Sequence, residues 1–248
     1  MFAEDPFAGW DSPYLKMPPR NIVPKPLQKP HPPLWTACSR RETIKYAAQR
    51  GVGALSFAFL EPEFAARPVA EYYRTLTSQE CVPAGFSVNP GFAVVIPMLC
   101  HADRQVALDR SLAGAQFFEF AKEHYYRPKR HYPGRTNLYR SFTRQYADKE
   151  QPIALGAIGA PDQLTALIQN YEQVGVDQLI FLTQAGLTRH QDICESLDLF
   201  ARAVMPRFAE GREEKEKIKA ERLGPAIEQA LARRSPVRTA SSDYCIDV

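Results

Sequence analysis

The order of short apolar segments and amphipathic helices is the feature that most restricts the fold of this chain. We expect strands at residues 34–38, 54–58, 92–100 and 178–183. The expected helices lie at about residues 39–49, 64–76, 103–123, 161–174 and 190–205. Alternation of strands with helices favours parallel strands with helices packed on their faces, and the predicted fold class is therefore α/β.

The first strand–helix junction has the features of an anion-binding site. Ser39 followed three residues later by Glu42 predicts a capping box, and therefore the start of a helix. The N–H groups of the first turn and the positive end of the helix dipole are commonly used to hold phosphate groups. Arg40 and Arg41 oppose that dipole, so a bound anion would explain them, and the Thr43 hydroxyl adds a donor. A plain capped helix start is the alternative interpretation.

The composition sets further limits. The chain has 248 residues, 45% of them hydrophobic, and a net charge of +3. It is long enough for a substantial core, and its charge does not by itself indicate nucleic acid. Five cysteines without a CxxC pair predict neither a disulfide framework nor a metal site. No segment resembles a signal peptide or a membrane span, so we expect a cytoplasmic protein with no membrane or nucleic-acid partner.

We divide the chain into three parts. Residues 1–33 are a Pro-rich lead-in, and residues 34–208 form the βα domain. Residues 209–248 are a charged tail, either an exposed helix or disordered. His31, which lies between prolines in the lead-in, is expected to be structural or solvated.

Two features of the βα domain have more than one interpretation. His101 directly follows the third strand, and strand carboxyl ends carry the ligand sites of barrels, so a ligand-facing role competes with a structural one. Residues 124–147 contain no acidic residue and mix Arg and Lys with Tyr and Phe. We interpret this segment as a mobile loop beside an anionic cofactor. A solvated connector and a surface for single-stranded nucleic acid are the alternatives.

Several segments resemble the bacterial luciferase-like flavin monooxygenases. PKPLQKPHPPLW and ACSRRETIKYAAQRG resemble a central segment of this family, and GAIGAPDQLTALIQNYEQVGVDQLIFL with SLDLFARAVMPRF resembles its C-terminal segment. The resemblance implies a TIM barrel whose flavin phosphate site lies where the fifth strand meets its helix. In this chain that site falls on Cys38, Ser39, Arg40 and Thr43. Bacterial luciferases have an acidic residue followed by Ser near this turn, whereas this chain has Ser39 followed by Arg40.

The resemblance also implies an activity. Reduced FMN and O2 would oxidise a small organic substrate, with NAD(P)H as the indirect electron source. None of the five histidines lies in a motif that identifies a catalytic acid or base. A deazaflavin-dependent reductase of the same superfamily and a non-catalytic flavin-binding or partner-completing subunit are the alternatives.

The number of predicted units does not suffice for a closed barrel. A TIM barrel has eight βα units in about 250 residues, whereas this chain has about four, like the C-terminal half of a luciferase-like protein. Four parallel strands would leave sheet edges and an apolar face open. We therefore expect a homo-oligomer, or completion by an N-terminal half-barrel.

Overall fold

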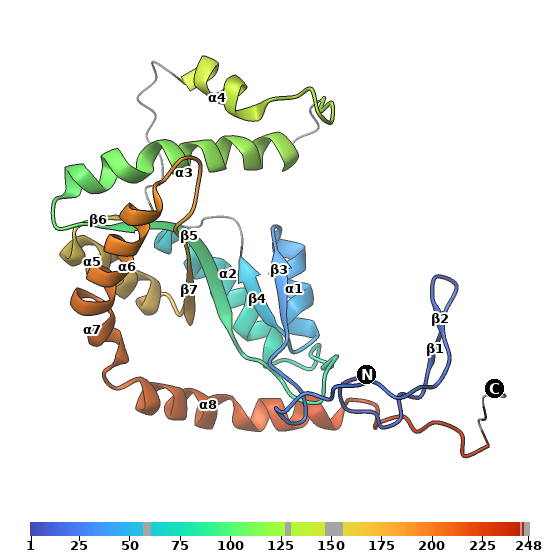
Figure 1. Cartoon of the computed structure of the whole chain (residues 1–248). Coiled ribbons are helices and arrows are strands. Elements are labelled where there is room, and N and C mark those ends of the chain that lie inside the picture. Colours follow the sequence, from blue (N-terminus) through green and yellow to red (C-terminus); the bar gives the residue numbers. More distant parts are fainter. Residues whose placement is uncertain (57–60, 127–129, 147–155, 244, 246–248) are drawn as a thin grey trace. The chain divides into compact units, whose positions relative to one another are not determined.

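The structure is a computed structural model that describes residues 1–56, 61–126, 130–146, 156–243 and 245. Its strands are β1 (Trp10–Asp11), β2 (Lys16–Met17), β3 (Trp35–Cys38), β4 (Gly53–Ser56), β5 (Phe92–Cys100), β6 (Ala157–Gly159) and β7 (Gln178–Leu182). Its helices are α1 (Arg41–Gln49), α2 (Pro62–Leu76), α3 (Arg104–Tyr126), α4 (Leu138–Tyr146), α5 (Pro161–Gln173), α6 (His190–Ala203), α7 (Met205–Ala209) and α8 (Arg212–Ala232). The predicted strands and helices are all present, apart from residues 57 and 58 of the second strand, which lie outside the described residues (Figure 1).

The chain divides into two compact units. The first contains Met1–Leu55, Ala70–Phe92 and Ile218–Val248, and the second contains Ser56–Val69 and Ala93–Lys217. No helix in the described ranges has the length and apolar run that a membrane span requires.

Strand β5 supplies the buried centre of the second unit. All nine of its residues are buried, which explains a continuous apolar run in place of alternation. Strand β7 pairs in parallel with Ala93–Pro97, and β6 pairs in parallel with Met98–Cys100. The partner changes directly after Pro97, a residue without a backbone N–H. Strand β6 was not predicted, because three residues are too few to show a period.

In the first unit, the Trp35 ring packs directly against the backbone of neighbouring segments. Strand β3 lies next to β4 in the sheet order, and the Leu34 carbonyl accepts the Gly53 N–H at 2.9 Å. A Cβ atom on Gly53 or Gly91 would lie only 2.4 or 2.6 Å from the Trp35 ring. Both positions therefore need glycine so that the indole can pack against the backbone.

His31 holds the Pro-rich lead-in. Its side chain is buried, and its Nε2 accepts the Phe86 N–H at 2.8 Å. Because Nε2 is the acceptor, the proton of a neutral ring lies on Nδ1, which is 2.8 Å from the Pro32 carbonyl oxygen. The structural role predicted for His31 is confirmed.

The charged tail is helical and anchored at its end. Helix α8 is the exposed-helix alternative predicted for this region. Arg233 donates to the carbonyl oxygens of Ser78 and Cys81 at 3.1 and 2.9 Å. Arg238 donates to both carboxylate oxygens of the buried Glu4, at 2.9 and 3.1 Å. These contacts make residues after α8 part of the first unit.

The prediction of a loop over residues 124–147 is confirmed for residues 130–137 and wrong for residues 124–126 and 138–146, which are helical. Helix α3 continues to Tyr126, and α4 occupies most of the second half, while residues 127–129 and 147 lie outside the described residues. Phe142 of α4 is buried, with ring centroids 5.6 Å from Phe117 and 5.8 Å from Phe120 of α3. Two of the aromatic rings that suggested a binding surface, those of Tyr139 and Phe142, thus pack α4 against α3 (Figure 1).

We expect Phe142→Ala to detach α4. Truncating a buried aromatic ring costs about 3–5 kcal/mol, so the melting temperature should fall and trypsin should cut within residues 130–146 sooner. Ser141→Ala, at an exposed neighbouring position, is the control. Equal cutting of both variants would show that the rings do not hold α4.

Candidate functional site

The turn between β3 and α1 is the predicted phosphate site, and its helix cap differs from the prediction. The proposed capping box of Ser39 and Glu42 is wrong, because the N-cap is Arg40, with an extended backbone (φ −137°, ψ 157°). The Thr43 hydroxyl accepts the Arg40 N–H at 3.3 Å and donates to the Arg40 carbonyl at 2.7 Å. Thr43 therefore plays the part expected of Glu42, one residue further along.

The four predicted site residues differ in whether their side chains can donate a hydrogen bond to a ligand. Cys38 is buried, its thiol lies 3.4 Å from the Thr36 carbonyl oxygen, and burial raises its pKa against weaker opposing hydrogen bonds. Ser39 and Arg40 are exposed. Because the Thr43 proton is already used by the Arg40 carbonyl, the Ser39 hydroxyl and the Arg40 guanidinium are the side-chain donors that remain.

The two arginines of this turn are not equivalent. Arg41 forms an ion pair with Glu71 of α2, with 2.5 Å between Nε and Oε2, and this contact raises the pKa of Arg41. Arg40 makes no ion pair with any described residue. The positive charge left open at the helix start is therefore that of Arg40, and the residues present fit an anionic group.

Ser56, at the end of β4, is a separate observation. Its hydroxyl is fully buried and makes no hydrogen bond with the described residues. A buried polar group without a partner is rare and calls for a water or a ligand.

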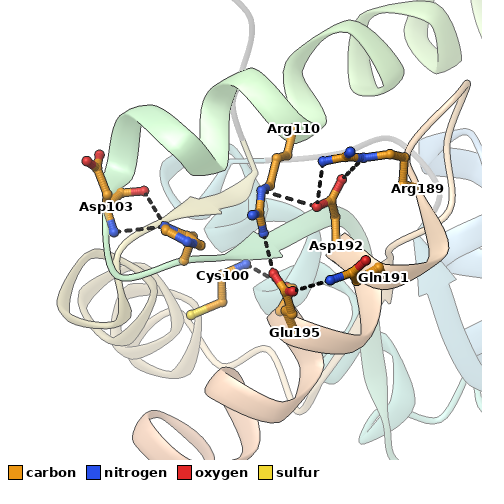
Figure 2. Close-up of polar contacts among 9 residues, drawn as sticks. Cys100, Asp103, Arg110, Arg189, Gln191, Asp192 and Glu195 are labelled. Atoms are coloured by element: carbon orange, nitrogen blue, oxygen red, sulfur yellow. Dashed lines mark hydrogen bonds and ion pairs between the residues drawn. The ribbon is translucent and has the colours of Figure 1, made fainter.

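The second unit contains a group of paired charges that the sequence analysis did not predict. Arg110 of α3 lies 3.2 Å from the Asp192 carboxylate and 2.7 Å from the Glu195 carboxylate of α6. Arg189, which precedes α6, contacts both oxygens of Asp192, at 2.8 and 3.2 Å (Figure 2). We call these four residues the ion-pair cluster.

The cluster keeps both of its acids ionised. The pKa of Asp192 is lowered, first by the hydrogen bond from Arg189 and, against burial, by the charges of Arg110, Arg189 and His101. The pKa of Glu195 is lowered by hydrogen bonds from Arg110 and Gln191. Two cations and two anions thus leave the cluster with no net charge.

Helix α6 is also bound to the end of β5. The Ser196 hydroxyl accepts the Cys100 N–H at 2.7 Å and donates to the Met98 sulfur at 3.4 Å. Burial raises the pKa of the Cys100 thiol to about 11, so this thiol stays protonated at neutral pH. Among the described residues, no three His, Cys, Asp or Glu side chains are placed to hold a metal ion.

The sequence signal for this cluster lay in the buried face of α6. Leu197 is exposed although it is apolar, whereas Asp192 and Ser196 are buried beside Ile193 and Phe200. Polar residues occupy the buried face because each has a hydrogen-bond partner there. Asp192 three residues after Arg189, one turn before Ser196 on the same face, is the pattern that could have indicated part of the cluster.

Comparisons with known proteins identify the family. The family model for luciferase-like monooxygenases matches residues 1–178, and the chain therefore belongs to this family. No curated protein matches the chain.

Solved structures of related fold support the α/β assignment. Monooxygenase RslO1 from Streptomyces bottropensis matches with TM-score 0.58 and 18% identity, over 84% of this chain and 57% of its own. The coenzyme F420 dependent tetrahydromethanopterin reductase from Methanopyrus kandleri matches with TM-score 0.53 and 14% identity, over 80% and 57%. The oxygenating constituent of 3,6-diketocamphane monooxygenase from Pseudomonas putida, in complex with FMN, matches with TM-score 0.51 and 14% identity, over 83% and 59%.

The chain thus has the fold of part of a luciferase-like TIM barrel. It spans less than three fifths of the length of these structures, which fits an incomplete barrel. At such low identity the likeness concerns the fold, and it does not transfer cofactor or substrate.

We expect Asp192→Asn to destabilise the chain strongly at neutral pH and weakly in acid. The pKa of Asp192 is lower in the folded than in the unfolded chain, so its contribution is complete above the ordinary value of about 4. That contribution is lost as the pH falls through the lower folded value. Melting temperatures of wild type and variant should differ by several degrees at pH 7 and converge towards pH 2.

Asp198→Asn makes the same change on the exposed side of α6, where Asp198 pairs with Arg202. Its effect should be small throughout. A pH-independent gap between wild type and Asp192→Asn would contradict the assigned ionisation.

Proposed function

We propose that the chain is part of a flavin-dependent monooxygenase that acts on a small organic substrate in the cytoplasm. The match to the luciferase-like monooxygenase family supports the reaction class. The observation that carries the cofactor assignment is the exposed, unpaired Arg40 beside the exposed Ser39 at the start of α1.

These residues would hold the phosphate of FMN. The Arg40 guanidinium and the Ser39 hydroxyl donate to phosphate oxygens, together with N–H groups of the first turn of α1. Cys38 contributes through its backbone, because its thiol is buried, and Thr43 keeps the cap in place. Reduced FMN, when bound, supplies electrons for the activation of O2, and NAD(P)H is their indirect source.

A deazaflavin-dependent reductase is the second candidate. Its support is the Ser39–Arg40 order in place of an acidic residue followed by Ser, and the F420-dependent Methanopyrus kandleri reductase among the related structures. Titrations with FMN and with coenzyme F420 separate the two assignments.

Arg40→Glu should weaken FMN binding about tenfold or more, because it replaces a charge-assisted donor with a repelling carboxylate. Isothermal titration of the full chain measures this change. Arg50→Glu makes the same charge change at the other end of α1 and is the control. Unchanged affinity in Arg40→Glu would remove the phosphate site from this turn, and tighter binding of F420 than of FMN would favour the reductase.

We further propose that the chain associates with a second copy or is completed by an N-terminal half-barrel. Gln178 and Ile180, which alternate along β7, are exposed, whereas every residue of β5 is buried. One face of β7 is therefore uncovered within the second unit, and apolar groups there favour association.

Ile180→Lys should reduce this association. The substitution places a charge on the uncovered face of β7, and size-exclusion chromatography with light scattering should show a lower mean mass than for wild type. Leu197→Lys, on the exposed part of α6, is the control. A wild-type chain that is monomeric and binds stoichiometric FMN would contradict both partner alternatives.

A further inference from the structure

Two histidines face each other where α3 ends. His124 lies in the last turn of α3, and His131 lies in the segment between α3 and α4 (Figure 1). The Nε2 atom of His124 is 3.2 Å from the Nδ1 atom of His131. Both residues belong to the second unit. Because His131 is exposed and His124 is half-buried, the pair lies at the surface.

The ring of Tyr125 lies against both imidazoles. Its centroid is 5.3 Å from that of His124 and 5.6 Å from that of His131. The two imidazole centroids are 5.4 Å apart, and their planes are inclined at 65°. This packing limits the rotation of both imidazoles, so the protein itself orients the two facing nitrogens.

The distance between the two nitrogens matches that in a zinc chelate. Zinc binds imidazole nitrogen at about 2.0–2.1 Å in a tetrahedral arrangement. Two nitrogens 3.2 Å apart then form an angle of about 99–106° at the ion, close to the tetrahedral value of about 109°. Square-planar Cu2+ requires an angle of about 90°, and therefore nitrogens only about 2.8–2.9 Å apart. Mg2+ and Ca2+ prefer oxygen ligands.

The pair can bind a metal ion without a change in its total charge. In the contact between the two rings, one nitrogen carries a proton and the other accepts it. Zinc takes the place of this shared proton, which moves to the outer nitrogen of the same ring. Each neutral ring then binds through its inner nitrogen and keeps one N–H group.

The pair supplies two of the four ligands of a tetrahedral site. Residues 124–146 contain no acidic residue, so this segment adds no carboxylate. Arg130 and Arg135 are exposed in the same segment, and their charges attract anions from the solvent. Water or a small anion therefore fills the two remaining positions, and the ion is held less tightly than in a structural zinc site with four protein ligands.

We propose that His124 Nε2 and His131 Nδ1 bind one zinc ion. The ion joins the end of α3 to the segment that leads to α4, across seven residue positions. Cysteine spacing did not indicate this site, because both of its ligands are histidines. The site goes beyond the proposed function, since neither histidine belongs to the turn between β3 and α1 and zinc binding is measured without a cofactor.

Titration calorimetry of the untagged full chain with zinc chloride measures the site. Exposed thiols also bind zinc, so the reference protein carries Ser in place of Cys194 and Cys245. It should bind one zinc ion, and Mg2+ should not bind. His124→Gln and His131→Gln should each weaken zinc binding about tenfold or more, because a single imidazole remains. His190→Gln removes another exposed histidine and is the control, and circular dichroism verifies folding.

Nitrogen NMR of the reference protein identifies the atoms that bind. Zinc should shift the resonances of Nε2 in His124 and of Nδ1 in His131, and should leave those of His101 unchanged. Unchanged zinc affinity in either Gln variant, or binding through the opposite nitrogen of either ring, would overturn the proposal.

His131→Cys separates a ligand from a residue that only packs. The thiolate sulfur is bonded to Cβ and lies near the position of Nδ1, and it is itself a zinc ligand. This variant of the reference protein should bind zinc at least as tightly as the reference protein does. Equal loss of affinity in His131→Cys and His131→Gln would show that the imidazole contributes only packing, and would remove the site.

Discussion

The hydrogen bond from the Cys100 N–H to the Ser196 hydroxyl is the contact on which the second unit depends. Consecutive N–H groups of a strand point to opposite edges, and that of His101 is used by β6. The Cys100 N–H therefore faces the other edge, where a buried donor without an acceptor would cost stability. Ser196 supplies the acceptor from a helix. It also sits at the centre of the α6 face that Asp192 and Phe200 extend by one turn on each side.

That face of α6 fixes three different elements. Asp192 pairs with Arg110 of α3, and Phe200 meets Phe181 of β7 edge to face at 5.1 Å. Ser196 lies between them and binds β5. A shift of α6 along its axis would break all three contacts together. The end of β5 is thus held by packing and by charge at the same time.

Strand and helix positions were predictable because the apolar periods are local. The run at β5 and the spacing in α5 need no partner to be recognised, and the family resemblance rests on similar segments. The role of Arg110 was not predictable, because the partners Asp192 and Glu195 are far along the chain. The cap was misplaced by one residue because Ser39 and Glu42 fit the sequence pattern of a capping box, whereas the helix begins after Arg40, a residue type outside that pattern. Helix α4 was not predicted, because the arginines between its aromatic residues obscure the helical spacing of those residues.

The start of α1 and the ion-pair cluster differ in how their charges are arranged. At the start of α1, Glu71 neutralises Arg41 and leaves Arg40 open, so the local field favours an anion. In the ion-pair cluster, two arginines and two carboxylates cancel and no net charge remains. A carboxylate added near Arg40 would neutralise the open positive charge there. Removal of one carboxylate from the ion-pair cluster would leave that cluster with a net positive charge. The preference of each region for an anion therefore depends on whether its arginines already have an ionic partner. The number of arginines matters less.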